Sequence, residues 1–191
     1  MTVFPRYTRT AAILHWLVAL LIVANVGLGV WANYAPDEWV RPIIDSHKSI
    51  GITVLGLALL RLLWRLAHPA PALPEHYARW EKVTAHGVHV LLYVAIFALP
   101  ISGWLHDSAW KGAATHPLTL FGVVPWFRLG FIEGLDPAVK EPLHALFGAV
   151  HVWFGYLLYG LLALHLAGAL KHQWIDGEPE VQRISPFFGR K

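Results

Sequence analysis

Two histidines that lie 14 residues apart in an uncharged segment are the residues of this sequence best placed to do chemistry. His151 and His165 belong to the stretch 143–170, which contains no Asp, Glu, Lys or Arg. On an α-helix this spacing is about 3.9 turns, so the two imidazoles point the same way within about 40° and lie roughly 21 Å apart. An ionisable side chain inside an apolar segment is costly and therefore indicates function. We expect two binding levels along one helix.

Each of these histidines needs a partner at its own depth. His15 lies near the start of the first apolar segment, and His47 begins the second. If successive segments cross a membrane in alternate directions, His15 reaches the level of His165 and His47 reaches the level of His151. The sequence therefore predicts two pairs of imidazoles, at two depths in the membrane.

Other histidines could replace the predicted partners. His144 precedes His151 by two helical turns, lies on nearly the same face, and is its first substitute. His86 and His89 open the third apolar segment and could compete with His15. The remaining histidines near helix ends are interpreted as interfacial polar residues: His68, His76, His106 and His116.

The ligands that the sequence lacks decide which cofactor fits paired imidazoles. There are 12 His but no Cys, and the only Met is the first residue, which excludes thiolate ligation, iron-sulfur clusters and covalent haem attachment. Zinc sites use three or four protein ligands, and no carboxylate lies near these histidines at depth. Haem iron takes two axial ligands, which predicts two bis-His haems. Glycines flank the ligands and would admit a macrocycle, although they suit ordinary helix packing equally well: Gly51, Gly56, Gly148, Gly155, Gly160 and Gly168.

The elements that must position the histidines are membrane-spanning helices. Apolar residues make up 56% of the 191 residues and charged residues 14%, against about 25% charged in soluble chains. Spans are expected at about 12–32, 47–66, 84–106 and 143–170, each near the ~20 residues that cross a bilayer. We predict an all-α integral membrane four-helix bundle, up-down-up-down, as a single domain over 1–191. The loop at 107–142 is rich in aromatic residues and should lie along the membrane interface.

Basic residues predict the orientation of the bundle. The N-terminus, the second connection and the tail hold ten of the 15 lysines and arginines, so both termini are expected in the cytoplasm. The net charge of +3 is not collected into any basic run. We therefore expect membrane lipid, and no nucleic acid, as a partner.

The apolar segments resemble a known family. The matching stretches are YTRTAAILHWLVALLIV, DSHKSIGITVLGLALLRLLWRL, AHGVHVLLYVAIFALPISG and HVWFGYLLYGLLALHLAGALKHQW. They are similar to the bacterial cytochrome b-561 proteins, whose best-known type is a superoxide oxidase, and to the cytochrome b subunits of nickel-iron hydrogenases and formate dehydrogenases. The resemblance implies a protein of the bacterial cytoplasmic (inner) membrane with two haem b groups. It implies His15 with His165 and His47 with His151 as iron ligands, and a quinone site at which His172 is the candidate.

Several functions are compatible with this pattern, and no catalytic residue is assigned. The first is electron transfer between an outer-face donor and ubiquinone. If the donor is superoxide, the protein is a superoxide:ubiquinone oxidoreductase whose outer cations steer the anion: Lys48, Lys111, Arg128 or Lys140. The alternative is a membrane anchor and electron relay for a hydrogenase-like or periplasmic redox partner, docked near 125–131. A third interpretation is a channel or transporter without a cofactor.

Overall fold

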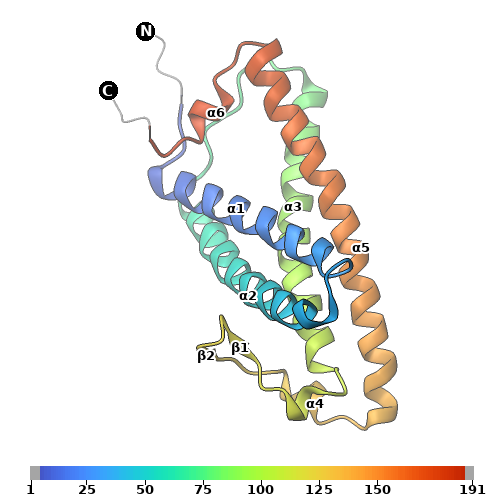
Figure 1. Ribbon diagram of the computed structural model, residues 1–191. Coiled ribbons are helices and arrows are strands. Elements are labelled where there is room, and N and C mark those ends of the chain that lie inside the picture. Colours follow the sequence, from blue (N-terminus) through green and yellow to red (C-terminus); the bar gives the residue numbers. More distant parts are fainter. Residues whose placement is uncertain (1–4, 188–191) are drawn as a thin grey trace.

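Four long helices dominate residues 5–187, the part of the chain that the computed structural model describes (Figure 1). They are α1 (Arg9–Trp31), α2 (Asp37–Ala67), α3 (Arg79–Ser108) and α5 (Pro137–Leu170). All four are long and apolar enough to cross a membrane. The predicted all-α, four-helix membrane bundle is confirmed.

Short elements fill the α3–α5 connection and the tail. The connection contains a 3₁₀ turn η1 (Ala113–Thr115), strands β1 (Thr119–Leu120) and β2 (Val124–Pro125), and α4 (Gly130–Glu133). The two strands form an antiparallel hairpin. After α5 come a π-helical turn η2 (Lys171–Ile175) and α6 (Glu180–Arg183).

Two helices extend well beyond their predicted spans. Helix α2 begins at Asp37 rather than near residue 47, and α5 begins at Pro137 rather than near 143. An apolar run marks only the part of a helix that lies in lipid, and the extensions carry polar residues that give no such signal. Helix α5 also has a local start signal, because the Asp136 carboxylate accepts a hydrogen bond from the Ala138 N–H at 2.8 Å.

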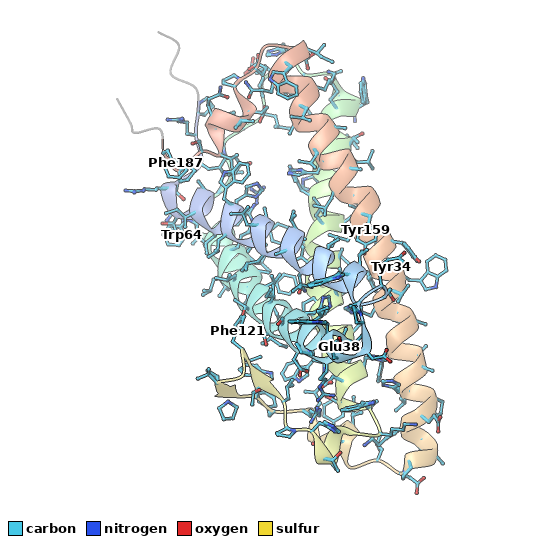
Figure 2. All side chains as sticks on the ribbon, in the orientation of Figure 1. Tyr34, Glu38, Trp64, Phe121, Tyr159 and Phe187 are labelled. Carbon is cyan, nitrogen blue, oxygen red and sulfur yellow. The ribbon has the colours of Figure 1, made fainter. Side chains whose placement is uncertain are left out.

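The helices pack as two antiparallel pairs. Helix α1 packs on α2, α3 packs on α5, and contacts between α2 and α3 join the pairs. An apolar cluster occupies the middle of the bundle, between the levels of the predicted histidine pairs: Val18, Ile22, Val54, Leu92, Ala95, Leu158 and Leu161. Large apolar side chains also cover the outer faces, as at Tyr159 on α5 (Figure 2). Such faces suit contact with lipid.

The two ends of the bundle differ. Residues 5 and 187, the first and last that the structure describes, lie at one end, here called the terminal end, while the hairpin and α4 lie at the other, the loop end (Figure 1). At the terminal end the buried Arg183 guanidinium donates to the carbonyls of Pro5 and Ala72, at 3.2 and 2.8 Å. This contact fixes α6 against the start of the chain and the α2–α3 connection.

Candidate functional site

The loop-end pair of histidines comes together as predicted. His47 of α2 and His151 of α5 have ring centres 5.9 Å apart, with an angle of 77° between the rings. The Nδ1 of His47 lies 3.0 Å from the Asn25 carbonyl oxygen, and that of His151 lies 2.9 Å from the Leu99 carbonyl oxygen. A carbonyl only accepts, so each Nδ1 carries the proton and donates. Each Nε2 is left with a free lone pair. This is the tautomer that a metal-bound histidine has when Nε2 is the ligand atom.

The terminal-end pair also forms, but with a third imidazole beside it. His15 of α1 and His165 of α5 have ring centres 6.2 Å apart at 69°. His89 of α3 lies 5.3 Å from His165, at 65°. The predicted partner and one of its two predicted competitors therefore both reach His165.

The ring separations show what these pairs can hold. An imidazole nitrogen lies about 2 Å from a metal that it coordinates, so two imidazoles on opposite sides of one metal have ring centres roughly 6 Å apart. Both predicted pairs match this separation, and the His89–His165 separation is shorter. In the described part of the chain, no group of three potential metal ligands includes either pair. Two axial nitrogens with an apolar surrounding fit haem iron and do not complete a zinc site.

Two glycines that sequence reasoning missed cradle the loop-end rings. A Cβ on Gly29 would lie 3.2 Å from the Cε1 of His47, and a Cβ on Gly103 would lie 3.2 Å from the Cε1 of His151. These approaches depend on how each helix is rotated toward its neighbour, which the sequence does not give.

The glycines expected to admit the macrocycle have mixed surroundings. Gly148 lies against the His106 ring, and a Cβ on Gly51 would lie 3.6 Å from the side chain of Asn25. Open space surrounds the other expected glycines: Gly56, Gly155, Gly160 and Gly168.

A second imidazole contact lies nearer the loop end. The rings of His106 on α3 and His144 on α5 stack with centres 3.8 Å apart. The Nδ1 of His106 donates to the His144 carbonyl at 2.8 Å, and the Nδ1 of His144 donates to the His106 carbonyl at 2.9 Å. His144, the predicted substitute for His151, is thus paired with His106, and it is His151 that faces His47.

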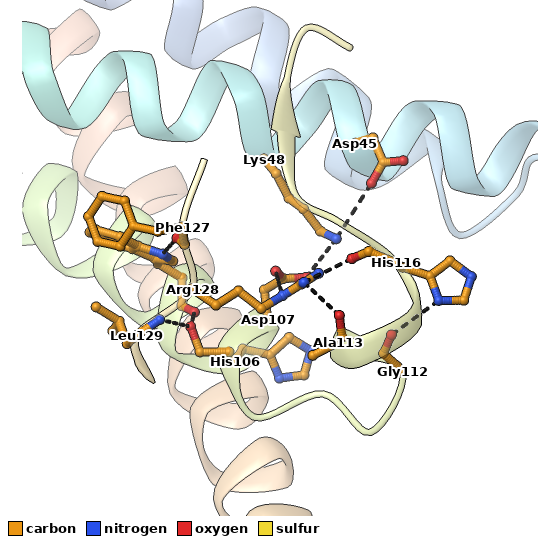
Figure 3. A network of polar contacts seen from close by, with 12 residues as sticks. Asp45, Lys48, His106, Asp107, Gly112, Ala113, His116, Phe127, Arg128 and Leu129 are labelled. Carbon is orange, nitrogen blue, oxygen red and sulfur yellow. Dashed lines mark hydrogen bonds and ion pairs between the residues drawn. The ribbon is translucent and has the colours of Figure 1, made fainter. Parts of the chain in front are cut away.

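Asp107 organises the charges of the loop end (Figure 3). Its buried carboxylate, 6% exposed, forms ion pairs with the Lys48 ammonium at 2.7 Å and the Arg128 guanidinium at 2.8 Å. Lys48 is also 3.5 Å from Asp45. Two of the four cations that were expected to steer an anion are therefore already held in ion pairs with a shared carboxylate.

His172 lies in the π-helical turn that follows α5. Its ring stacks on Tyr77, with centres 4.2 Å apart, and its Nδ1 lies 2.6 Å from a carboxylate oxygen of Asp176. Lys171 donates to the same carboxylate and to that of Glu81, and this hydrogen bond lowers the pKa of Asp176. Glu81, His172 and Asp176 resemble a metal-ligand group, but the Lys171 ammonium already supplies the positive charge.

Tyr77 supports His172 from the α2–α3 connection. The side chain is 6% exposed, and its hydroxyl donates to a carboxylate oxygen of Glu180 at 2.9 Å. Burial raises the pKa of Tyr77, and the hydrogen bond to Glu180 raises it further. The polar face of this end is thus held in a fixed arrangement around one imidazole.

Comparisons with known proteins agree over nearly the whole chain. A family profile described as prokaryotic cytochrome b561 matches residues 6–186. Cytochrome b561 homolog 2 of Escherichia coli is 32% identical, covering 94% of this chain and 90% of the relative. Cytochrome b561 homolog 1 of the same organism is 24% identical, covering 95% of this chain and 97% of the relative. A probable superoxide oxidase, CybB of Yersinia pestis, is 26% identical over 91% and 92%.

Proposed function

Because this chain belongs to the prokaryotic cytochrome b561 family of haem b electron-transfer membrane proteins, we propose that it carries electrons across a bacterial inner membrane between an outer-face donor and quinone. The observation that carries the proposal is the placement of two imidazole pairs at two levels of one bundle, with ring centres 6.2 and 5.9 Å apart. His15 with His165, and His47 with His151, are the proposed iron ligands of two haem b groups.

The chain's own residues hold the ligands and exclude water. When bound, haem iron supplies one-electron oxidation and reduction. The Asn25 and Leu99 carbonyls fix the tautomer of His47 and His151. The apolar cluster that includes Val18, Val54 and Leu158 keeps the region between the two levels dry. An electron that passes from one level to the other therefore needs no charged carrier to cross the lipid.

The distribution of basic residues supports an orientation with the terminal end in the cytoplasm. Of the 13 lysines and arginines among residues 5–187, eight lie at or near that end. In this orientation the pair His47–His151 lies near the outer face, and His15–His165 lies near the cytoplasm. Single cysteines placed at Ser185 and at Thr115, labelled from either side of sealed vesicles, test the assignment; labelling of Ser185→Cys from outside the cell would reverse it.

The site proposed for quinone lies at the terminal end, beside His172. With Nδ1 bonded to Asp176, the Nε2 of His172 is the ring nitrogen that would meet quinone. It donates to a quinone carbonyl oxygen when the ring is in its imidazolium form, in which both nitrogens carry protons. Reduction of a quinone by two electrons also takes up two protons, which a histidine at the water-facing end of the bundle can relay. His172 is thus proposed as a proton-donating and positioning group for quinone.

Two donors are compatible with the loop end. Superoxide is one, supported by the likeness to the probable superoxide oxidase. Since Lys48 and Arg128 are held in ion pairs with the buried Asp107, steering of superoxide would fall mainly to Lys111 and Lys140. Stopped-flow mixing with superoxide should reduce the purified protein faster than superoxide dismutates. A rate equal to spontaneous dismutation would exclude superoxide as the donor.

A redox partner protein is the second donor, and one surface supports it. The hairpin and α4 expose large apolar side chains at the loop end, with Phe121 at the hairpin tip (Figure 2). Phe121 is 60% exposed, Val123 79% and Phe131 73%. The relay function is supported if a redox protein copurifies in stoichiometric amount with the wild type from native membranes. The double variant Phe121→Ser, Phe131→Ser should then lose this partner. Purification of a cytochrome that oxidises superoxide without a partner supports the first.

A further inference from the structure

A small cavity at the terminal end carries more hydrogen-bond donors than acceptors. It opens between α1, α2 and α3, close to the His15–His165 level, and is lined by Tyr7, Ala11, Arg61, Arg65, His68 and Tyr93. Two of these residues are arginines on α2, a helix proposed to lie in lipid. A guanidinium has five N–H donors, no acceptor and a permanent positive charge.

The polar groups of this cavity lack an anionic partner. Arg61 donates to the Ala11 carbonyl at 3.1 Å, and within residues 5–187 neither Arg61 nor Arg65 forms an ion pair with a carboxylate. The Tyr93 hydroxyl is buried and, among the described residues, has no hydrogen-bond partner. Half-buried cations and a buried hydroxyl are costly without partners. An anion that offers several acceptor oxygens would complete the set.

The position of the cavity indicates which anion this is. Ala11 lies one helical turn before His15 on α1, so the Arg61 guanidinium is about one turn, roughly 5 Å, closer to the terminal end than His15. A group bound between His15 and His165 would therefore have one edge next to the cavity. Haem b is apolar except for one edge, which bears two propionate carboxylates.

We propose that Arg61, Arg65 and Tyr93 bind the two propionates of the haem held by His15 and His165, an inference that rests on the proposed function. Two guanidiniums balance two carboxylates, and the phenol hydroxyl donates one further hydrogen bond. The arrangement orients the ring: its carboxylate edge faces the terminal end, and its apolar edge faces the cluster that contains Val18 and Leu161.

This site also raises the reduction potential of the terminal-end haem. Positive charge beside a haem disfavours the ferric state, which carries one more positive charge than the ferrous state. Propionate anions favour the ferric state, and pairing them with arginines cancels that effect. Loss of either arginine should therefore move the potential of this haem downward while the loop-end haem keeps its own value. The two effects can be separated because the bundle holds the pairs at different levels.

The test is a potentiometric titration of purified Arg61→Gln, Arg65→Gln and Tyr93→Phe, followed at the haem bands, with Arg9→Gln as the control. Arg9 lies at the same end and does not line the cavity, so its loss changes net charge equally. Redox-difference infrared spectra of protein grown with haem labelled with ¹³C at the propionates report on the carboxylates directly. Arg61→Lys, which keeps the charge and loses the planar fork, guards against a variant that fails to fold.

We expect one redox component to shift to lower potential in both Gln variants, with altered propionate bands and roughly tenfold faster haem transfer to apomyoglobin. Arg9→Gln should match the wild type. Two haems bound with unchanged potentials and propionate bands in all three variants would overturn the inference and leave the proposed function standing. Phospholipid retained by the wild type and lost in Arg61→Gln, with unchanged haem bands, would assign the cavity to a lipid phosphate instead. A wild-type protein that binds no haem would refute both this inference and the proposed function.

Discussion

The imidazole of His165 lies between two others, with the ring centre of His15 at 6.2 Å and that of His89 at 5.3 Å. Only one of these can be the second axial ligand of a haem bound to His165. The His15 separation matches two ligands on opposite sides of one metal, and the His89 separation is too short for that arrangement.

The first prediction separates these two histidines. His15→Ala should remove one haem, because it deletes an axial ligand, and His89→Ala should retain both. The measurement is haem per protein by the pyridine haemochromogen method, with circular dichroism to confirm that the bundle is intact. Loss of a haem in His89→Ala together with full retention in His15→Ala would assign His89 as the ligand.

The second prediction concerns the contact of Gly103 with His151. A Cβ at this position would lie 3.2 Å from the Cε1 of the imidazole, so Gly103→Ala should tilt the ring and change the electron paramagnetic resonance signal of the loop-end haem. Gly160→Ala is the control, because Gly160 is on the opposite face of α5 from His151 and its Cβ would meet nothing within 4 Å. An unchanged signal in Gly103→Ala would show that the glycine is not needed for the ring position.

The third prediction tests the buried charge at the loop end. Asp107→Asn leaves Lys48 and Arg128 without their shared carboxylate, and should reduce the free energy of unfolding by about 3 kcal/mol. Asp45→Asn, which removes a half-exposed partner of Lys48 and Arg41, should cost less than about 1 kcal/mol. Denaturant titration in detergent measures both. Equal effects of the two substitutions would show that the buried Asp107 pairs contribute no more to stability than the Asp45 pair.

The helices and the histidine pairs could be predicted from the sequence, whereas the residues that surround the histidines could not. The spacing of His151 and His165 fixed two levels on one helix, because the helical period is rigid, and alternating crossings then brought His15 and His47 to those levels. The Gly29 contact with His47 was missed because it depends on helix rotation. The stacking of His106 on His144 was missed for the same reason, since each ring meets a residue from a different helix.

The loop end was the least predictable region. The aromatic residues suggested an interfacial loop, but the Asp107 network depends on where the 109–136 connection folds back on α2. The backbone N–H of Phe121 donates to the Ser49 hydroxyl at 2.9 Å. This contact joins residues that are far apart in sequence and have no shared pattern.

The fourth prediction tests the proposed quinone site. His172→Gln should slow quinone-dependent oxidation of the reduced protein roughly tenfold or more, because the proton donor is lost, while the haem spectra stay unchanged. His76→Gln is the matched control at the same end, since His76 is largely exposed and pairs with Glu178. Equal rates for the two variants would place the quinone elsewhere.

The fifth prediction follows from the raised pKa of Tyr77, which is due mainly to burial and then to Glu180. The folded state holds this proton more tightly than the unfolded state, so the contribution to stability is complete below about pH 10 and is lost as the pH rises above it. Tyr77→Phe has no such group. The difference in Tm between wild type and Tyr77→Phe should therefore narrow from pH 9 to pH 12, measured by thermal unfolding in detergent. A constant difference would contradict the assignment.

The central claim is that four histidines hold two haems, and the most direct test is a reduced-minus-oxidised spectrum combined with the haem-to-protein ratio. We expect two haems per wild-type chain, and one in His165→Ala with the loop-end haem still visible in the spectrum. A colourless protein after growth with ample iron and haem precursor would contradict it. So would the loss of both haems in a His165→Ala variant that remains folded.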